Sequence, residues 1–173
     1  AAILWGLDGI LRRSLFSLPP ITIVFYEHLI GAILIAPFLI RVWKSERLTS
    51  SEWTTLAIVA LFSGILGTLF FTTALLQTGF IAFSVVFLIQ KLQPIFAVAA
   101  GVLLLKERVT SAYLLWAALA LLAGYFVTFP NGIVNLDTGG GTAIAALYAL
   151  GAAFAWGSST TFSKMLLGKV DFK

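Results

Sequence analysis

The chain alternates between long apolar runs and short polar or charged segments. The runs extend over residues 1–18, 21–42, 53–76, 80–110, 112–129 and 142–167. A helix needs about 20 mostly apolar residues to cross the hydrocarbon core of a bilayer, and these runs have roughly that length. The pattern therefore predicts an all-α integral membrane protein, a bundle of about six transmembrane helices.

Polar residues and prolines mark the ends of the runs. Pro19-Pro20 ends the first run and Pro130-Asn131-Gly132 ends the fifth, because proline is tolerated only in the first turn of a helix. The polar segment RVWKSERLTSSEW separates the second run from the third. Within it, Ser50 or Ser51 is the expected N-cap of the third helix.

Composition agrees with a membrane protein and excludes several other classes. The chain is 60% hydrophobic and 10% charged, with a mean hydropathy of +1.04, whereas soluble domains carry about 25% charged residues. It has no cysteine and one histidine, so we expect no disulfide, no zinc site and no cofactor. The net charge is only +4, and the basic residues sit mostly at run ends. This placement indicates topology rather than nucleic-acid binding, and it fits a multi-pass protein of the bacterial inner membrane.

The middle of the fourth run is polar. Gln90, Lys91, Gln93 and Pro94 interrupt it, and a lysine at mid-membrane costs roughly 2.5–3.5 kcal/mol. Such residues are tolerated where protein or a water-filled cavity satisfies them. We therefore expect Lys91, Gln90 and Gln93 to contact a polar or anionic substrate, with Pro94 shaping the helix. The alternative is a structural ion pair, perhaps between Lys91 and Glu27.

Four further ionisable residues lie inside apolar runs. Glu27 and His28, in the second run, are candidates for substrate contact and for coupling transport to protons. Their alternative is a structural role as partners for Lys91 or for a helix outside this chain. Asp8 and Arg12 are four residues apart, so they can pair on a helix. With Trp5 they share one face, which either lines a cavity or holds a structural pair.

The last run carries a polar face of its own. Trp156, Ser159 and Thr160 share one side of it. Their hydroxyl groups could bind a ligand, or they could join neighbouring helices.

Arg13 and Lys164 lie near run ends, where they either contact substrate or lipid headgroups or only set the depth of their helices. Glu107 is expected to play a structural role at its helix end, beside Lys106 and Arg108.

The chain contains an internal repeat. The segment AILWGLDGILRRSL aligns without gaps with AFAWGSSTTFSKML, so that Trp5-Gly6 matches Trp156-Gly157 and Arg13 matches Lys164. The copies lie in the first and the sixth predicted helices, which are five helices apart along the chain. The second copy therefore enters the membrane in the opposite direction, which is typical of inverted-repeat transporters.

These features resemble a known family. The Trp-Gly pair followed by a basic residue, together with the segment TTALLQTGFIAFSVVFLIQKLQPIFAVAAGVLLLKERVT, is similar to the EamA-like repeat of the drug/metabolite transporter superfamily. Pro94, Glu107 and Thr110 match the pattern of its fourth helix. The resemblance implies a ten-helix transporter built from two inverted five-helix repeats around a central cavity. Residues 1–130 would then form the first repeat with a truncated first helix, 131–141 a loop, and 142–173 the first helix of the second repeat.

We expect a secondary transporter that moves a small metabolite or drug-like solute by alternating access, rather than an enzyme. No nucleotide site is predicted, because the glycine-rich segment at 138–142 lacks the lysine of a phosphate-binding loop. The remaining helices of the second repeat, or a homodimer partner, would complete the bundle within the lipid bilayer. Two alternatives remain: a membrane assembly subunit whose buried charges are structural, and an intramembrane lipid enzyme using Glu27 and His28.

Overall fold

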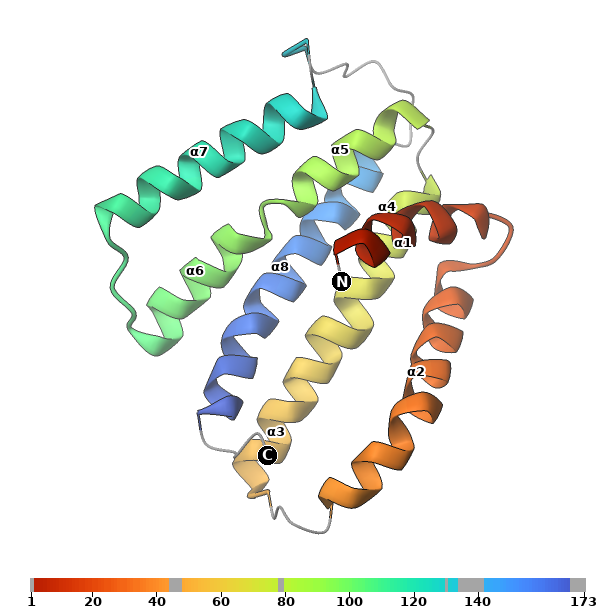
Figure 1. The fold of residues 1–173 in the computed structure, drawn as a ribbon, viewed down its shortest axis with the longest axis vertical. Coiled ribbons are helices and arrows are strands. Elements are labelled where there is room, and N and C mark those ends of the chain that lie inside the picture. Colours follow the sequence, from red (N-terminus) through yellow and green to blue (C-terminus); the bar gives the residue numbers. More distant parts are fainter. Residues whose placement is uncertain (1, 44–47, 78–79, 130, 134–141, 169–173) are drawn as a thin grey trace.

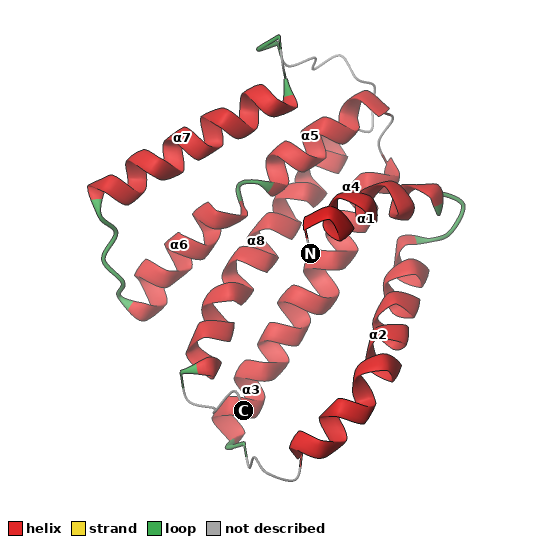
Figure 2. Ribbon diagram, viewed as in Figure 1, coloured by secondary structure: helices red, strands yellow, loops and turns green. Residues whose placement is uncertain are grey.

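The computed structural model describes residues 2–43, 48–77, 80–129, 131–133 and 142–168 of the chain. Figure 2 shows that every regular element in these ranges is helical, as predicted. In chain order (Figure 1) the elements are α1 (Ala2–Ser14), α2 (Pro20–Trp43), α3 (Ser50–Val59), the π-helical stretch η1 (Ala60–Gly67), α4 (Thr68–Gln77), α5 (Phe80–Gln90), α6 (Gln93–Leu105), α7 (Ser111–Thr128) and α8 (Thr142–Leu167).

Four segments within the described residues are long and apolar enough to cross a membrane. They are Pro20–Leu39, Ser50–Gln77, Ser84–Leu105 and Ala143–Leu167, and α7 contains a shorter apolar helix. The apolar runs therefore predicted the helices well, including the bounds of α8. Pro20 begins α2, where its missing N–H costs no hydrogen bond.

The predicted cap of the third run is wrong, because the N-cap of α3 is Thr49. Its backbone is extended, and its hydroxyl oxygen accepts a hydrogen bond from the Glu52 N–H. The Glu52 carboxylate in turn accepts from the Thr49 N–H at 2.7 Å. This reciprocal capping box satisfies two N–H groups at once, which neither Ser50 nor Ser51 can match inside the helix.

The fourth run is broken into two helices. α5 ends at Gln90 and α6 begins at Gln93. Between them, Lys91 N donates to Leu88 O at 3.0 Å and Leu92 N donates to Ile89 O at 3.0 Å, so the chain tightens before the break. Pro94 lies in the first turn of α6, where a residue without an N–H fits. The sequence predicts that Pro94 shapes the helix. In the structure the helix is interrupted just before this proline.

Helix α8 is the centre of the bundle. It packs against α3, η1, α4, α5 and α6, and Figure 1 shows it between the α5–α6 pair and the α3–α4 segment. Its inward side is made of small residues, among which Ala145, Ala149 and Ala152 are fully buried. At Gly157 a Cβ would lie 2.6 Å from the Gln93 carbonyl oxygen and 2.7 Å from Phe96 Cβ. α8 and α6 therefore approach to backbone contact, which is how membrane helices associate in lipid.

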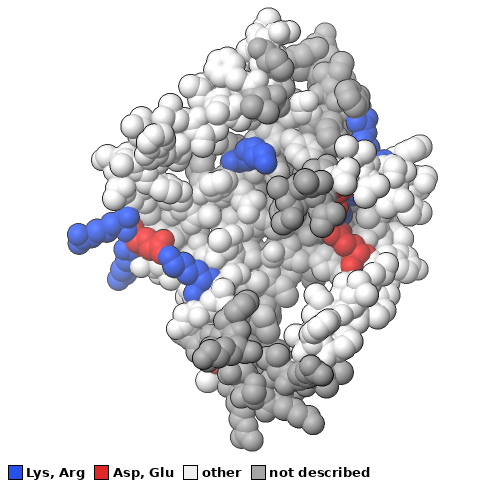
Figure 3. Space-filling view, in the orientation of Figure 1, with Lys and Arg blue, Asp and Glu red and all other residues white. Residues whose placement is uncertain are grey.

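The outer surface suits a bilayer. Large apolar side chains such as Phe16, Phe38, Leu103 and Trp116 are mostly exposed, and Figure 3 shows few charged side chains on a largely uncharged face. Such an extensive apolar surface would drive a soluble monomer to aggregate, whereas hydrocarbon chains cover it without cost.

Replacing Gly157 with alanine should separate α8 from α6. The new methyl group must displace backbone atoms of Gln93 and Ala97, so we expect a loss of about 1–3 kcal/mol in stability. Gly31→Ala is the matched control, because a Cβ there meets nothing within 4 Å. Thermal unfolding of both variants in detergent tests this, and equal midpoints would contradict the close contact.

Candidate functional site

A polar cavity of about 580 Å³ lies among the helices. Its wall comes from α1, α2, the η1–α4 segment, α6 and α8, which are elements far apart in sequence. The lining residues are Asp8, Arg12, Glu27, His28, Ser63, Gly64, Thr68, Phe71, Gln93, Trp156, Ser159, Thr160 and Ser163. Two of them are apolar aromatic residues, and most of the others offer hydrogen-bonding groups or charge.

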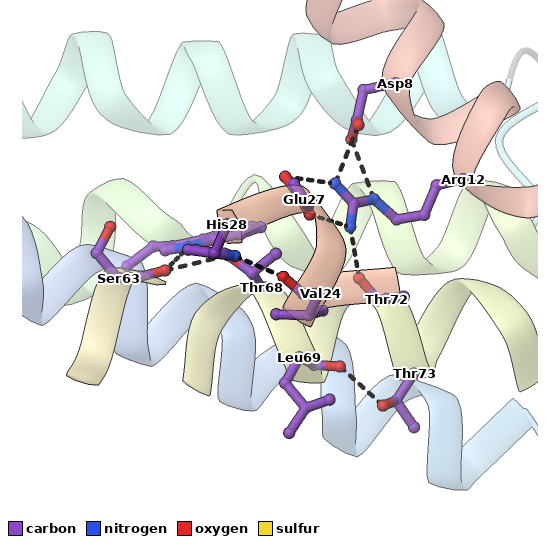
Figure 4. A network of polar contacts seen from close by, with 11 residues as sticks. Asp8, Arg12, Val24, Glu27, His28, Ser63, Thr68, Leu69, Thr72 and Thr73 are labelled. Carbon is purple, nitrogen blue, oxygen red and sulfur yellow. Dashed lines mark hydrogen bonds and ion pairs between the residues drawn. The ribbon is translucent and has the colours of Figure 1, made fainter. Parts of the chain in front are cut away.

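Arg12 is the electrostatic centre of one side of the cavity (Figure 4). Its guanidinium donates to Asp8 at 3.0 Å and to Glu27 at 2.8 Å, and it also donates to the Thr72 hydroxyl at 2.8 Å. The Arg12 side chain is only 6% exposed, whereas those of Asp8 and Glu27 are 42% and 43% exposed. One buried cation thus joins α1, α2 and α4, while its two carboxylates stay accessible from the cavity.

This network decides between two readings of the sequence. The predicted pair of Asp8 and Arg12 is confirmed. The suggested ion pair between Glu27 and Lys91 is wrong, because Glu27 binds Arg12 instead. Lys91 is exposed at the break between α5 and α6, and it is not among the residues that line this cavity. The side of a broken helix that a residue faces depends on the geometry of the break, which spacing alone does not determine.

His28 lies beside the Arg12 network and also faces the cavity. Its Nδ1 is 2.8 Å from the carbonyl oxygen of Val24, one turn earlier in α2. A carbonyl only accepts hydrogen bonds, so Nδ1 carries the proton of this bond. The opposite nitrogen, Nε2, points toward Gly64 in η1, where a Cβ would lie 3.4 Å away.

The π-helical stretch shapes the facing wall. Within it, the Ser63 carbonyl accepts hydrogen bonds from the Trp156 indole N–H at 3.0 Å and from the Thr68 hydroxyl at 3.2 Å. A π-helical turn disturbs the regular α-helical ladder and often occurs at functional sites. Here it offers a backbone oxygen to a side chain from α8.

The hydroxyl residues of α8 divide between the two predicted roles. Ser159 and Thr160 line the cavity, and the Thr160 hydroxyl also donates to the Trp156 carbonyl at 3.0 Å. Thr161 instead donates to the Ala97 carbonyl at 3.1 Å, which ties α8 to α6. The same short segment therefore serves both the cavity and the helix interface.

The glutamines beside the helix break lie in different surroundings. Gln93 lines the cavity at the start of α6. Gln90 is only 5% exposed, and its Oε1 has no hydrogen-bond partner among the residues that the structure describes. Gln90 is therefore a buried acceptor beside the break rather than part of the cavity wall.

The residues predicted to be structural lie away from the cavity. Glu107 pairs with Lys164, which joins the end of α6 to α8. The Glu107 N–H also donates to Gly101 O at the end of α6, and the expected structural role of the Glu107 side chain stays a prediction. Arg13 lies in the last turn of α1. The side chain of Trp5 lies outside the described residues.

Spacing alone did not reveal the lining residues Ser63 and Thr68 or the Arg12 partner Thr72. These three polar residues recur about one turn apart in the third run, and this stripe was the available signal. Thr72 is fully buried and binds Arg12. An apolar run with a polar stripe at helical spacing predicts a face turned toward a polar interior.

The fold and the cavity define a polytopic α-helical membrane protein with a polar chamber between its helices. Residues 1–129 match the model of the EamA-like transporter family, and the chain belongs to that family, which consists of transporters rather than enzymes. It is 42% identical over 176 residues to the riboflavin transporter ImpX of Fusobacterium nucleatum subsp. nucleatum, covering 100% of this chain and 59% of that protein. The chain thus spans about three-fifths of the length of this curated relative. No solved structure matches it.

A double-mutant cycle should distinguish the two proposed partners of Glu27. Arg12→Met and Glu27→Gln should show a coupling free energy of about 0.5–3 kcal/mol, because the two residues share a partly buried ion pair. Lys91→Met and Glu27→Gln should add within error. Chemical unfolding in detergent measures both cycles, and coupling to Lys91 alone would contradict this network.

Proposed function

We propose that this chain forms the first repeat, and the first helix of an inverted second repeat, of a secondary transporter in the cell inner membrane. The gapless match between the segments around Trp5 and Trp156 supports this division. So does α8, which packs as a central element against helices from most of the preceding sequence. Two inverted repeats would rock about a cavity and open it to one side at a time.

The polar cavity is the observation on which this proposal rests. A chamber of about 580 Å³ falls within the range of roughly 300–1,000 Å³ that is usual for small-molecule sites. Charged and polar side chains inside a membrane bundle are costly unless they serve a pathway or a structural network. Here the carboxylates of Asp8 and Glu27 remain partly exposed, which is what a water-accessible pathway requires.

We propose riboflavin, or a solute with a similar flat heteroaromatic ring, as the substrate. The 42% identity to a riboflavin transporter supports this choice. The cavity wall also combines the aromatic rings of Phe71 and Trp156 with the polar side chains of Gln93 and Ser159. Flat heteroaromatic solutes need both kinds of contact, apolar on the ring face and polar at the ring edge.

Reconstituted intact protein should take up riboflavin into liposomes without nucleotide. Gln93→Ala should lower uptake by roughly three- to tenfold at low solute concentration, because it removes a hydrogen-bonding group from the wall. Gln77→Ala is the matched control, since Gln77 is an exposed glutamine at the end of α4. Uptake no greater than in protein-free liposomes would overturn the substrate assignment.

The same assay extends to the helix break, where we propose that Lys91 and Gln90 also contact the solute. Loss of uptake in a well-folded Lys91→Ala variant would place the break on the solute's path. Unchanged uptake would make Lys91 a charge outside that path and leave the cavity wall as the site.

We also propose that Glu27 and His28 couple transport to protons, since both face the cavity. An inward proton gradient should accelerate uptake by the unaltered protein, and Glu27→Gln should abolish that acceleration because a glutamine cannot exchange a proton. Glu52→Gln is the control, since a glutamine also completes the capping box of α3. Uptake with equal gradient dependence in both variants would exclude Glu27 from coupling.

A membrane assembly subunit is the second candidate, and the Arg12 network is the observation in its favour. One buried guanidinium that joins three helices is also what a purely structural charge cluster would provide. This reading predicts no uptake of any solute, with Arg12 variants affecting only stability and assembly.

A further inference from the structure

The indole of Trp156 is held on several sides. Its Nε1 donates to the Ser63 carbonyl at 3.0 Å. Its edge occupies the space beside Gly67, where a Cβ would lie 2.4 Å from Nε1 and 2.5 Å from Cδ1. The Phe71 ring lies 5.3 Å away, centroid to centroid, at an interplanar angle of 54°. Rotation of the indole would break the hydrogen bond and strike one of these neighbours.

The π-helical stretch provides both contacts of the indole edge. Ser63 and Gly67 are four residues apart in η1 and lie against α8. The irregular ladder leaves the Ser63 carbonyl available to a side-chain donor, and the absent side chain of Gly67 makes room for the ring. Carbonyl and glycine together form a seat for Trp156.

Trp156 nevertheless lines the cavity and is only partly buried. Phe71, which packs against it, is only 2% exposed. Around this apolar surface are the polar groups of Thr68, Gln93 and Ser159. A fixed flat apolar surface with hydrogen-bonding groups at its border is complementary to a planar ring that carries polar atoms at its edge.

We infer that Trp156 is the stacking platform for the ring of the transported solute and that it selects planar heteroaromatic solutes. This inference rests on the proposed transport function and adds the residue that recognises the ring. Because Ser63, Gly67 and Phe71 already hold the indole in place, stacking on it requires little ordering of the side chain, which favours binding.

Flavin fluorescence tests the platform directly, because an indole stacked on the flavin ring quenches its emission. Intact protein in detergent is titrated against riboflavin, with equilibrium dialysis as an independent measure of binding. Trp156→Leu should weaken binding about tenfold or more and abolish quenching. Trp156→Phe should fall between the two, since it keeps a ring but loses the N–H. Lumichrome, which has the ring without the ribityl chain, should compete with riboflavin, and ribitol should not.

Two further variants keep the test decisive. Gly67→Ala keeps Trp156 in the sequence but pushes its indole out of the seat, so this variant should also reduce quenching. It still tests the stacking platform if Trp156→Leu fails to fold. Trp116→Leu removes a tryptophan that is mostly exposed on α7, and it should bind and quench like the unaltered protein.

The outcomes separate this inference from the function on which it rests. Riboflavin uptake with unchanged affinity and quenching in folded Trp156→Leu and Gly67→Ala would overturn the platform and leave the transport function standing. Binding of lumichrome that depends on Trp156, without riboflavin uptake, would support the platform and overturn the substrate assignment. Absence of binding by riboflavin and lumichrome alike would overturn both.

Discussion

The close packing of small residues along α8 is the constraint on which the rest of this structure depends. In lipid, burying apolar side chains between helices gains little, because hydrocarbon solvates them as well as protein does. Association therefore relies on close contact and on hydrogen bonds. Ala145, Ala149 and Ala152 of α8 are fully buried, and Gly157 brings the α8 backbone against Gln93 and Ala97 of α6. Only where helices lie this close can Thr161 of α8 reach the Ala97 carbonyl of α6. The same holds for Trp156 of α8, which reaches the Ser63 carbonyl of η1.

The small residues are spread along α8, whereas charge inside the bundle is concentrated at a few positions. Arg12 is buried, and a buried cation without partners would be strongly unfavourable. Its two carboxylates and the Thr72 hydroxyl meet that requirement from three helices. The arrangement leaves the carboxylates half-exposed toward the cavity, so the groups that stabilise Arg12 are the same ones available to solutes and water. Structural and functional readings of this network are therefore not exclusive.

The sequence predicted the helices better than the contacts between them. Bilayer thickness fixes the length of an apolar run, so the bounds of α2, α7 and α8 followed from composition along the chain. Polar residues at membrane depth likewise indicated Gln93, Glu27 and Ser159, which line the cavity. The partner of Glu27 did not follow, because the pairing of Glu27 with Arg12 depends on how two helices are rotated and placed. Lys91 and Thr49 show the same limit locally: a helix break and a capping box each depend on the backbone path.

In the π-helical stretch Ala60–Gly67, the number of residues matters as well as their types. A π turn contains a residue more than an α turn, so the helix on one side of it is out of phase with the helix on the other. Deleting any one residue there would allow a regular ladder, and it would rotate Ser50–Val59 relative to Thr68–Gln77 by about 100°. Ser63 and Gly67 could then no longer face α8 together. Insertions and deletions in this stretch should therefore be tolerated far less than most single substitutions there.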